Sequence, residues 1–142
     1  MQKPIARVLL VESYFDLGSL MRATLTRSHL DTTLVNSGED ALECLAEDDF
    51  DLLLVDTSLP GMSGLELCRL VREERRLRSL PIMLVSGDAD PELKEETRRL
   101  GAVDIIVKPF QTLPFLASVL GHLRLQPRVA PTPPHRVPFL AV

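Results

Sequence analysis

Asp51-Leu52-Leu53-Leu54-Val55-Asp56, followed by Thr57-Ser58-Leu59-Pro60-Gly61, is the stretch of sequence that decides the fold. An unbroken apolar run that ends in a turn is typical of a strand buried on both faces of a sheet. Open parallel sheets bind ligands at the carboxyl ends of their strands, so Asp56 stands where a functional carboxylate is expected. Aspartate also opens turns, and this stretch alone leaves both interpretations of Asp56 open.

The rest of the chain alternates short apolar runs with segments of helical spacing. Five strands separated by five helices predict an α/β fold, a doubly wound parallel sheet in the order 2-1-3-4-5 with helices on both faces. Gly101 is expected to stop the fourth helix. The predicted strands are 5–11, 32–35, 51–56, 81–85 and 102–107, and the predicted helices begin at Asp16, Ser37-Gly38, Gly64, Asp90-Pro91 and Thr112, the last running to Leu123.

Proline divides the 142-residue chain into two parts. Five of the 11 prolines fall in the last 16 residues, a spacing that no helix survives. We therefore expect one domain over residues 1–124 and a Pro-rich tail or linker over residues 125–142. The tail closes on apolar Phe139-Leu140-Ala141-Val142, which suggests that this segment docks on a surface.

Charge and hydropathy narrow the class of protein. A net charge of −4 argues against direct binding of nucleic acid, and no apolar run reaches the roughly 20 residues that span a membrane. The segment before the first strand is too short for a signal peptide, and Cys44 and Cys68 are interpreted as core thiols, so a cytoplasmic protein is expected. The run Arg72, Arg75, Arg76 and Arg78 is interpreted as a solvated helix end, with a docking patch as the alternative.

Four chemically useful side chains end four contiguous strands of the predicted sheet. They are Glu12, Asp56, Ser86 and Lys108, which the topology brings into one crevice. A carboxylate can attack phosphorus, neighbouring carboxylates can hold Mg²⁺, and an ammonium and a hydroxyl can bind phosphoryl oxygens. This set therefore suits phosphoryl transfer.

Several motifs together resemble one family. From about Ile5 to Leu123 the chain resembles the receiver domain of two-component response regulators, the CheY-like family, which implies a flavodoxin-like three-layer sandwich. The motifs that carry the resemblance are Val8-Leu9-Leu10-Val11-Glu12, Leu53-Leu54-Val55-Asp56 with Pro60-Gly61 and Gly64-Leu65-Glu66, Pro81-Ile82-Met83-Leu84-Val85-Ser86-Gly87, Gly101-Ala102 and Val107-Lys108-Pro109-Phe110.

The resemblance also implies roles for the residues at the strand ends. Asp56 would be the phosphoacceptor, Ser86 the active-site hydroxyl and Lys108 the counter-ion of the phosphoryl group, with a cis Lys108-Pro109 bond. Mg²⁺ would be held by Glu12, Asp56 and the backbone carbonyl of Ser58.

Three positions bear on how the site would work. The family usually has two adjacent acidic residues after the first strand, whereas this chain has Glu12-Ser13, so Ser13 is expected to be a weak or lost ligand for Mg²⁺. Ile105 stands where the family commonly has an aromatic side chain that changes rotamer. Asp88 lies where the family tunes dephosphorylation, and it is interpreted either as a residue that places a hydrolytic water or as a solvated loop charge.

Two functions remain open at the level of sequence. The first is a receiver that a sensor histidine kinase phosphorylates on Asp56; the second is an atypical receiver that binds proteins without phosphorylation. Neither is an independent enzyme. The resemblance implies a downstream protein target or a homodimer through the face formed by the fourth helix, fifth strand and fifth helix. On that last helix Phe115 and Val119 are expected to face the sheet, and Leu116 and Leu120 to point outward.

Overall fold

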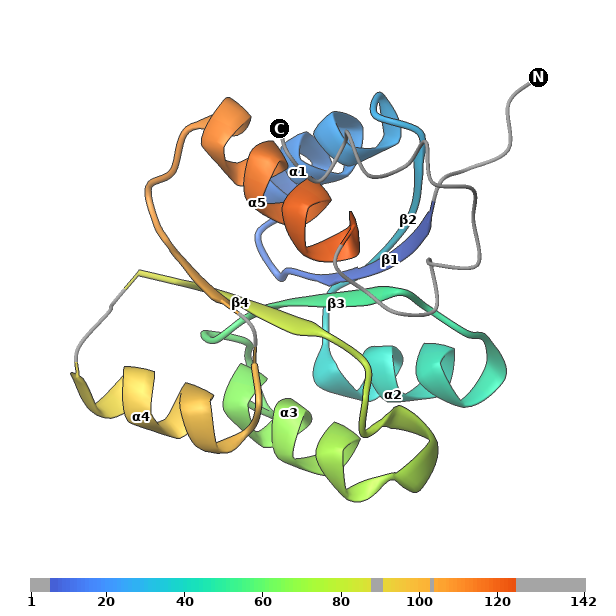
Figure 1. The fold of residues 1–142 in the computed structure, drawn as a ribbon, viewed down its shortest axis with the longest axis vertical. Helices are drawn as coiled ribbons and strands as arrows, with labels where there is room; N and C mark the ends of the chain where they lie inside the picture. The colour runs from blue at the N-terminus through green and yellow to red at the C-terminus, as the bar shows by residue number, and fades with distance from the viewer. Residues whose placement is uncertain (1–5, 88–90, 103, 125–142) are drawn as a thin grey trace.

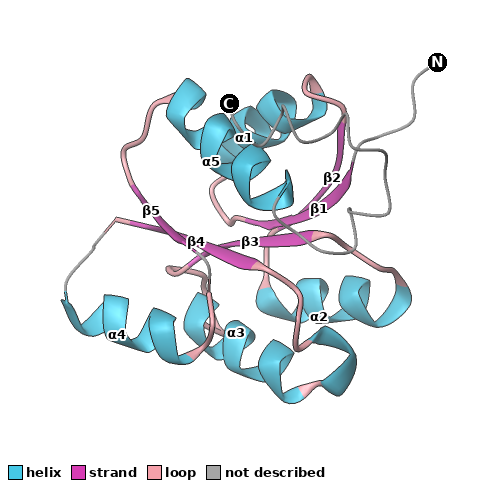
Figure 2. Ribbon diagram, in the orientation of Figure 1, coloured by secondary structure: helices cyan, strands magenta, loops and turns pink. Residues whose placement is uncertain are grey.

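Five short apolar runs form one parallel sheet between two layers of helices (Figures 1 and 2). The computed structural model describes residues 6–87, 91–102 and 104–124. The strand order is β2-β1-β3-β4-β5, with every neighbouring pair parallel, so the predicted doubly wound topology is confirmed. In chain order the elements are β1 (Ala6–Val11), α1 (Phe15–Thr26), β2 (Leu30–Val35), α2 (Gly38–Glu47), β3 (Leu52–Asp56), α3 (Gly64–Glu73), the 3-10 turn η1 (Arg75–Leu77), β4 (Ile82–Ser86), α4 (Pro91–Arg99), β5 (Asp104–Val107) and α5 (Thr112–Arg124).

The core has two halves, one on each face of the sheet. Every residue of β3 and β4 is buried, because helices cover both faces, and this explains their unbroken apolar sequences. Successive side chains of a strand point to opposite faces. Leu53 and Val55 therefore pack in the cluster that includes residues of α2 and α3, whereas Leu52 and Leu54 pack in the cluster that includes residues of α1 and α5. Figure 1 shows α1 and α5 on one side of the sheet and α2, α3 and α4 on the other.

The helix boundaries agree with several local signals in the sequence. Ser37 and Ser63 cap α2 and α3, each side-chain oxygen accepting a backbone N–H three residues on at 3.1 Å. Pro91 opens α4, as predicted, and Gly101 follows that helix with a φ of 71°, a conformation that glycine adopts without strain.

Other predicted boundaries were wrong by a few residues. Asp16 does not cap α1; the helix begins at Phe15, and Asp16 lies in its first turn, where its charge suits the helix dipole. Strand β2 begins at Leu30, two residues before the predicted start, because its whole length pairs with β1. Strand β5 begins at Asp104, and its pairing with β4 starts there rather than at Ala102.

Helix α5 buries a wider face than predicted. Phe115 and Val119 are fully buried on the sheet, as expected. Leu116 and Leu120, which were predicted to point outward, are half-buried and pack against the same cluster. Adjacent positions along one side of a helix can share a broad apolar face, so both stripes contribute to packing. Leu113 is the exposed leucine of this helix, with 76% of its surface accessible.

The interpretation of the arginine run as a solvated helix end is wrong for Arg72. Its guanidinium is half-buried and donates to backbone carbonyl oxygens from two separate segments. The acceptors, with donor–acceptor distances, are Leu100 (2.7 Å), Gly101 (3.1 Å), Leu77 (3.1 Å), Arg78 (3.2 Å) and Leu80 (2.7 Å). Arg72 therefore joins the end of α3 to the turn before β4 and to the turn after α4. Arg75, Arg76 and Arg78 are exposed, as predicted.

Candidate functional site

Three of the predicted site residues meet at the carboxyl ends of β1, β3 and β5. The ammonium of Lys108 forms an ion pair with Oδ2 of Asp56 and lies 3.6 Å from Oε1 of Glu12. Both carboxylates are only 2% exposed, whereas the Lys108 side chain reaches the surface. The sheet therefore brings two buried carboxylates and one cation together, as the strand order predicted.

Backbone contacts fix the end of β3 that carries Asp56. The Ser58 N–H donates to Oδ1 of Asp56 at 2.8 Å, and the Thr57 N–H donates to the Val85 carbonyl at 2.9 Å. Gly64 crosses this turn so closely that a Cβ there would lie 2.3 Å from the carbonyl oxygen of Asp56. From the sequence, Gly64 was interpreted as the start of a helix and as part of a family motif, without this close approach to the Asp56 carbonyl.

Ser86 and Lys108 are tied together through the backbone. Ser86 ends β4, is buried, and accepts the Lys108 N–H at its carbonyl oxygen at 2.7 Å. The Lys108-Pro109 peptide bond is cis, which confirms that prediction. The fourth predicted strand-end residue therefore lies directly beside the segment that supplies the lysine.

The two carboxylates differ in their readiness to ionise. Burial, followed by hydrogen bonding with Asp56, raises the pKa of Glu12 to about 7. Burial also acts against ionisation of Asp56, but hydrogen bonding with Glu12 and Lys108 outweighs it and holds the pKa of Asp56 below its ordinary value. Of the two carboxyl groups, Asp56 is therefore the one that ionises more readily.

The residues present fit a magnesium ion that keeps several water ligands. Mg²⁺ in proteins is commonly held by one or two carboxylates, with water or phosphate oxygens completing six ligands. Oε1 of Glu12 is buried and accepts no hydrogen bond from the described residues, so a hard oxygen donor is available beside Asp56. Across the described part of the chain, however, no three acidic, histidine or cysteine side chains gather as a metal cluster. Glu12 and Asp56 would thus be the carboxylate donors, with the Ser58 carbonyl as the predicted neutral one.

Ser13 and Ile105, two of the remaining predicted residues, lie in the described part of the chain. Ser13 is half-buried and, with Asn36 and Asp40, lines a pocket of about 310 Å³ on the β2 side of Glu12. Ile105 is half-buried on β5 and packs against the core cluster on the α2 and α3 side. Asp88, with both of its interpretations, lies outside the described residues.

The strand order and the carboxylate–lysine cluster together are typical of receiver domains with a flavodoxin-like fold. The family model for the response regulator receiver domain matches residues 8–119, and the chain belongs to that family. It is therefore a receiver domain of two-component signalling. Domains of this family receive signals from sensor histidine kinases, generally bind Mg²⁺ and are generally not metabolic enzymes.

Individual relatives agree with this assignment. The response regulator ArlR of Staphylococcus haemolyticus is 32% identical over 124 residues, which cover 87% of this chain and 55% of that protein. The chain thus spans about half the length of the curated relatives it matches. Among solved structures, the chemotaxis protein CheY4 of Vibrio cholerae has a TM-score of 0.77 at 27% identity, covering 80% of this chain and 95% of that one. The signal receiver domain of a histidine kinase from Syntrophus aciditrophicus has a TM-score of 0.75 at 29% identity, covering 91% and 96%.

Proposed function

We propose that a sensor histidine kinase phosphorylates Asp56 and that the modification switches a protein-binding surface of this receiver domain. The observation that carries the proposal is the ion pair between Lys108 and Asp56, with Asp56 held as a carboxylate at the end of β3. A carboxylate in that state is the nucleophilic form of the side chain.

In the proposed reaction an oxygen of Asp56 forms a bond to the phosphorus of a phosphohistidine. The phosphorus–nitrogen bond breaks, and its electron pair returns to the imidazole. Lys108 then binds an oxygen of the acyl phosphate, and the hydroxyl of Ser86 donates to another. Mg²⁺ held by Glu12, Asp56 and the Ser58 carbonyl would supply positive charge to the phosphoryl oxygens.

A second function is favoured by Ser13. A serine hydroxyl is a neutral and weaker ligand for Mg²⁺ than a carboxylate, so the site has less charge with which to bind the ion. Ile105 also favours this second function. Its half-buried aliphatic side chain has no polar group that could form a hydrogen bond in response to a change at Ser86. The alternative is a receiver that binds its partner without phosphorylation.

Intact mass measurement separates these two functions. The folded chain is incubated with a small acyl-phosphate donor, with and without Mg²⁺, beside Asp56→Asn. Phosphorylation on Asp56 requires the gain of one phosphoryl group that disappears without Mg²⁺ and in Asp56→Asn. If the folded parent gains nothing and Ser13→Asp restores the gain, the parent site is degenerate and the binding module is the function.

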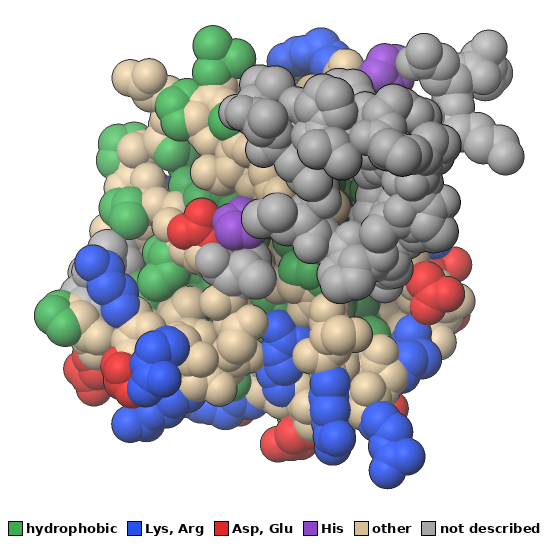
Figure 3. Space-filling view, in the orientation of Figure 1, with side chains coloured by type: hydrophobic (Ala, Val, Ile, Leu, Met, Phe, Trp, Pro, Cys, Tyr) green, Lys and Arg blue, Asp and Glu red, His purple; other side chains and the backbone are tan. Residues whose placement is uncertain are grey.

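The proposal extends to partners and domain limits. Residues 1–124 would be the receiver and 125–142 the Pro-rich tail or linker, in a protein of the cytoplasm. The downstream protein or a second copy would bind the face of α4, β5 and α5, where Val107 and Leu113 are exposed. In Figure 3 Lys, Arg, Asp and Glu side chains gather over α3 and α4, in the lower part of the view. Within the described ranges no helix is long and apolar enough to cross a membrane.

A further inference from the structure

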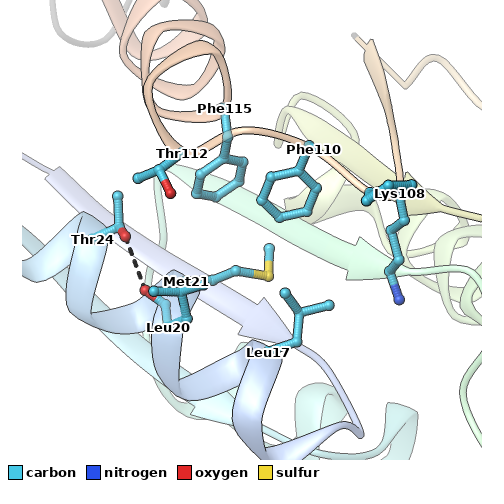
Figure 4. Close-up of a pocket in the computed structure, with 9 residues that line it drawn as sticks. Leu17, Leu20, Met21, Thr24, Lys108, Phe110, Thr112 and Phe115 are labelled. Atoms are coloured by element: carbon cyan, nitrogen blue, oxygen red, sulfur yellow. Dashed lines mark hydrogen bonds between the residues drawn. The ribbon is translucent and has the colours of Figure 1, made fainter.

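A cleft of about 390 Å³ opens between α1 and the first turn of α5. Figure 4 shows Leu17 and Met21 of α1 facing the rings of Phe110 and Phe115, which stack with their centroids 4.9 Å apart. Leu20, Thr24, Pro109, Thr112 and the stem of Lys108 complete its lining. The volume falls in the range of pockets that bind ligands, roughly 300–1,000 Å³.

The lining is apolar where it meets solvent, and apolar surface continues beyond the cleft. Leu20 at its edge is 51% exposed, and Leu113 in the same turn of α5 as Thr112 is 76% exposed. Contiguous exposed apolar surface marks a site that another segment or molecule covers. The few polar groups, Thr24 and Thr112, are hydroxyls, and Thr24 already donates to the Leu20 carbonyl at 2.9 Å. The chemistry of the cleft therefore favours an aromatic or aliphatic occupant without charge.

The segment Pro138–Val142 has this composition and is tethered nearby. It reads Pro-Phe-Leu-Ala-Val and follows 13 residues, 125–137, that carry four prolines. Thirteen residues would reach about 40 Å if they were extended as polyproline. Helix α5 is 13 residues long, so its length from Arg124 back to Thr112 is about 20 Å. The connecting residues are thus long enough to return the segment along α5 to the cleft.

We propose that Pro138–Val142 docks in the cleft between α1 and α5, with the ring of Phe139 against Met21 and Phe110. Tethering gives such a segment an effective concentration in the millimolar range, so a modest apolar contact suffices for occupancy. The proline-rich connection limits the conformational freedom lost on docking.

Docking at this place would act on the functional site through Lys108. The stem of Lys108 lines the cleft while its ammonium pairs with Asp56 and lies near Glu12. An occupant packed against that stem restricts the lysine to its present arrangement. The segment is thereby an internal ligand whose release frees both the cleft and Lys108.

Methyl NMR on the full chain tests the contact directly. With labelled methionine and leucine methyls and labelled Phe139, docking predicts nuclear Overhauser effects between the Phe139 ring and the Met21 methyl. Phe139→Asp should abolish them and shift the Met21 and Leu17 methyl resonances, whereas Thr132→Asp, a charge in the connecting residues, should leave them in place. If the segment is docked for about nine-tenths of the time, a small apolar probe should bind the cleft about tenfold more weakly in the parent chain than in Phe139→Asp.

Two results would overturn the proposal. The first is the absence of these effects together with Met21 resonances that are the same in the parent and in Phe139→Asp. The second comes from mixing labelled with unlabelled chains: effects seen only between chains, with a doubled mass by light scattering, would assign the cleft to a second copy. Neither readout depends on phosphorylation, so failure of this contact is distinguishable from failure of the function proposed for Asp56.

Discussion

Glu12 and Asp56 present two buried carboxylates to a single ammonium, that of Lys108. Removing charge from water is costly, and one cation cannot fully compensate two anions. The raised pKa of Glu12 is the direct result, because protonating Glu12 leaves one carboxylate and one ammonium in the site. The site therefore favours binding of a further proton or cation, and its stability depends on the positive charge of Lys108.

Replacing Lys108 by methionine should lower the free energy of unfolding by about 2 kcal/mol at pH 7. The reason is that both carboxylates then lose their counter-ion while remaining buried; the loss falls short of the roughly 3–5 kcal/mol for fully buried pairs because the lysine is partly exposed. Urea unfolding in the absence of divalent ions measures the change.

The control for this prediction is Lys94→Met on the exposed surface of α4, which should change stability by less than about 0.5 kcal/mol. In the double variant Lys108→Met with Asp56→Asn, most of the loss should be recovered, since only one carboxylate then remains. A loss in the double variant as large as in the single one would show that lysine packing, and not charge, explains the effect.

Arg72→Met should lower the free energy of unfolding by about 3 kcal/mol, because several backbone carbonyls lose their donor in a partly buried position. Arg72→Lys should recover only part of that loss, since a single ammonium cannot reach acceptors on two segments as the planar guanidinium does. Arg75→Met, at an exposed position of η1, is the matched control and should be nearly neutral. Equal effects at positions 72 and 75 in urea unfolding would contradict the assigned role of Arg72.

Arg72 also shows where sequence reasoning reached its limit. The strands, their order and the meeting of Glu12, Asp56 and Lys108 follow from apolar runs and from residues at strand ends, which are local signals. The acceptors of Arg72 come from segments up to 29 residues away, and no periodicity encodes them. The sequence of an arginine-rich helix end is the same whether its guanidinium groups are hydrated or donate hydrogen bonds to backbone carbonyls.

For a similar reason, the sequence did not predict which side chains of α5 are buried or how closely Gly64 approaches β3. Which leucines of α5 are covered depends on how the helix lies on the sheet, and the spacing of Leu116 and Leu120 does not determine that. Gly64 is a common helix opener, and its close approach to the Asp56 carbonyl exists only once β3 and α3 are placed.

The two cysteines should differ in reactivity in the folded chain. Burial raises the pKa of Cys68 to about 12, so its thiolate is scarce at pH 8, whereas Cys44 is only half-buried. Intact mass should therefore show that iodoacetamide at pH 8 adds one group to the folded parent chain. The Cys44→Ala variant should gain no group until urea unfolds it. Raising the pH from 7 to 8 should speed the first addition, because more Cys44 thiolate forms, and leave Cys68 unmodified. Two additions at equal rates to the folded parent chain would contradict the burial of Cys68.

Gly64→Ala and Gly121→Ala should change stability in opposite directions. Alanine in a helix normally gains about 0.5–1 kcal/mol over glycine, because less backbone freedom is lost on folding. At Gly121, an exposed position of α5, an added Cβ meets no described atom within 4 Å, so this gain should appear in urea unfolding. At Gly64 the Cβ would lie 2.3 Å from the Asp56 carbonyl oxygen and 2.8 Å from Cα of Thr57, so backbone must move. We expect a loss of about 2–4 kcal/mol in the free energy of unfolding there, because the clashing atoms belong to the backbone and cannot move aside by a change of rotamer.

The same backbone shift should move Asp56 away from Lys108. The folded fraction of Gly64→Ala should therefore also accept a phosphoryl group more slowly than Gly121→Ala. Equal stabilisation by both alanines would mean that the turn after β3 is free to relax and does not position Asp56.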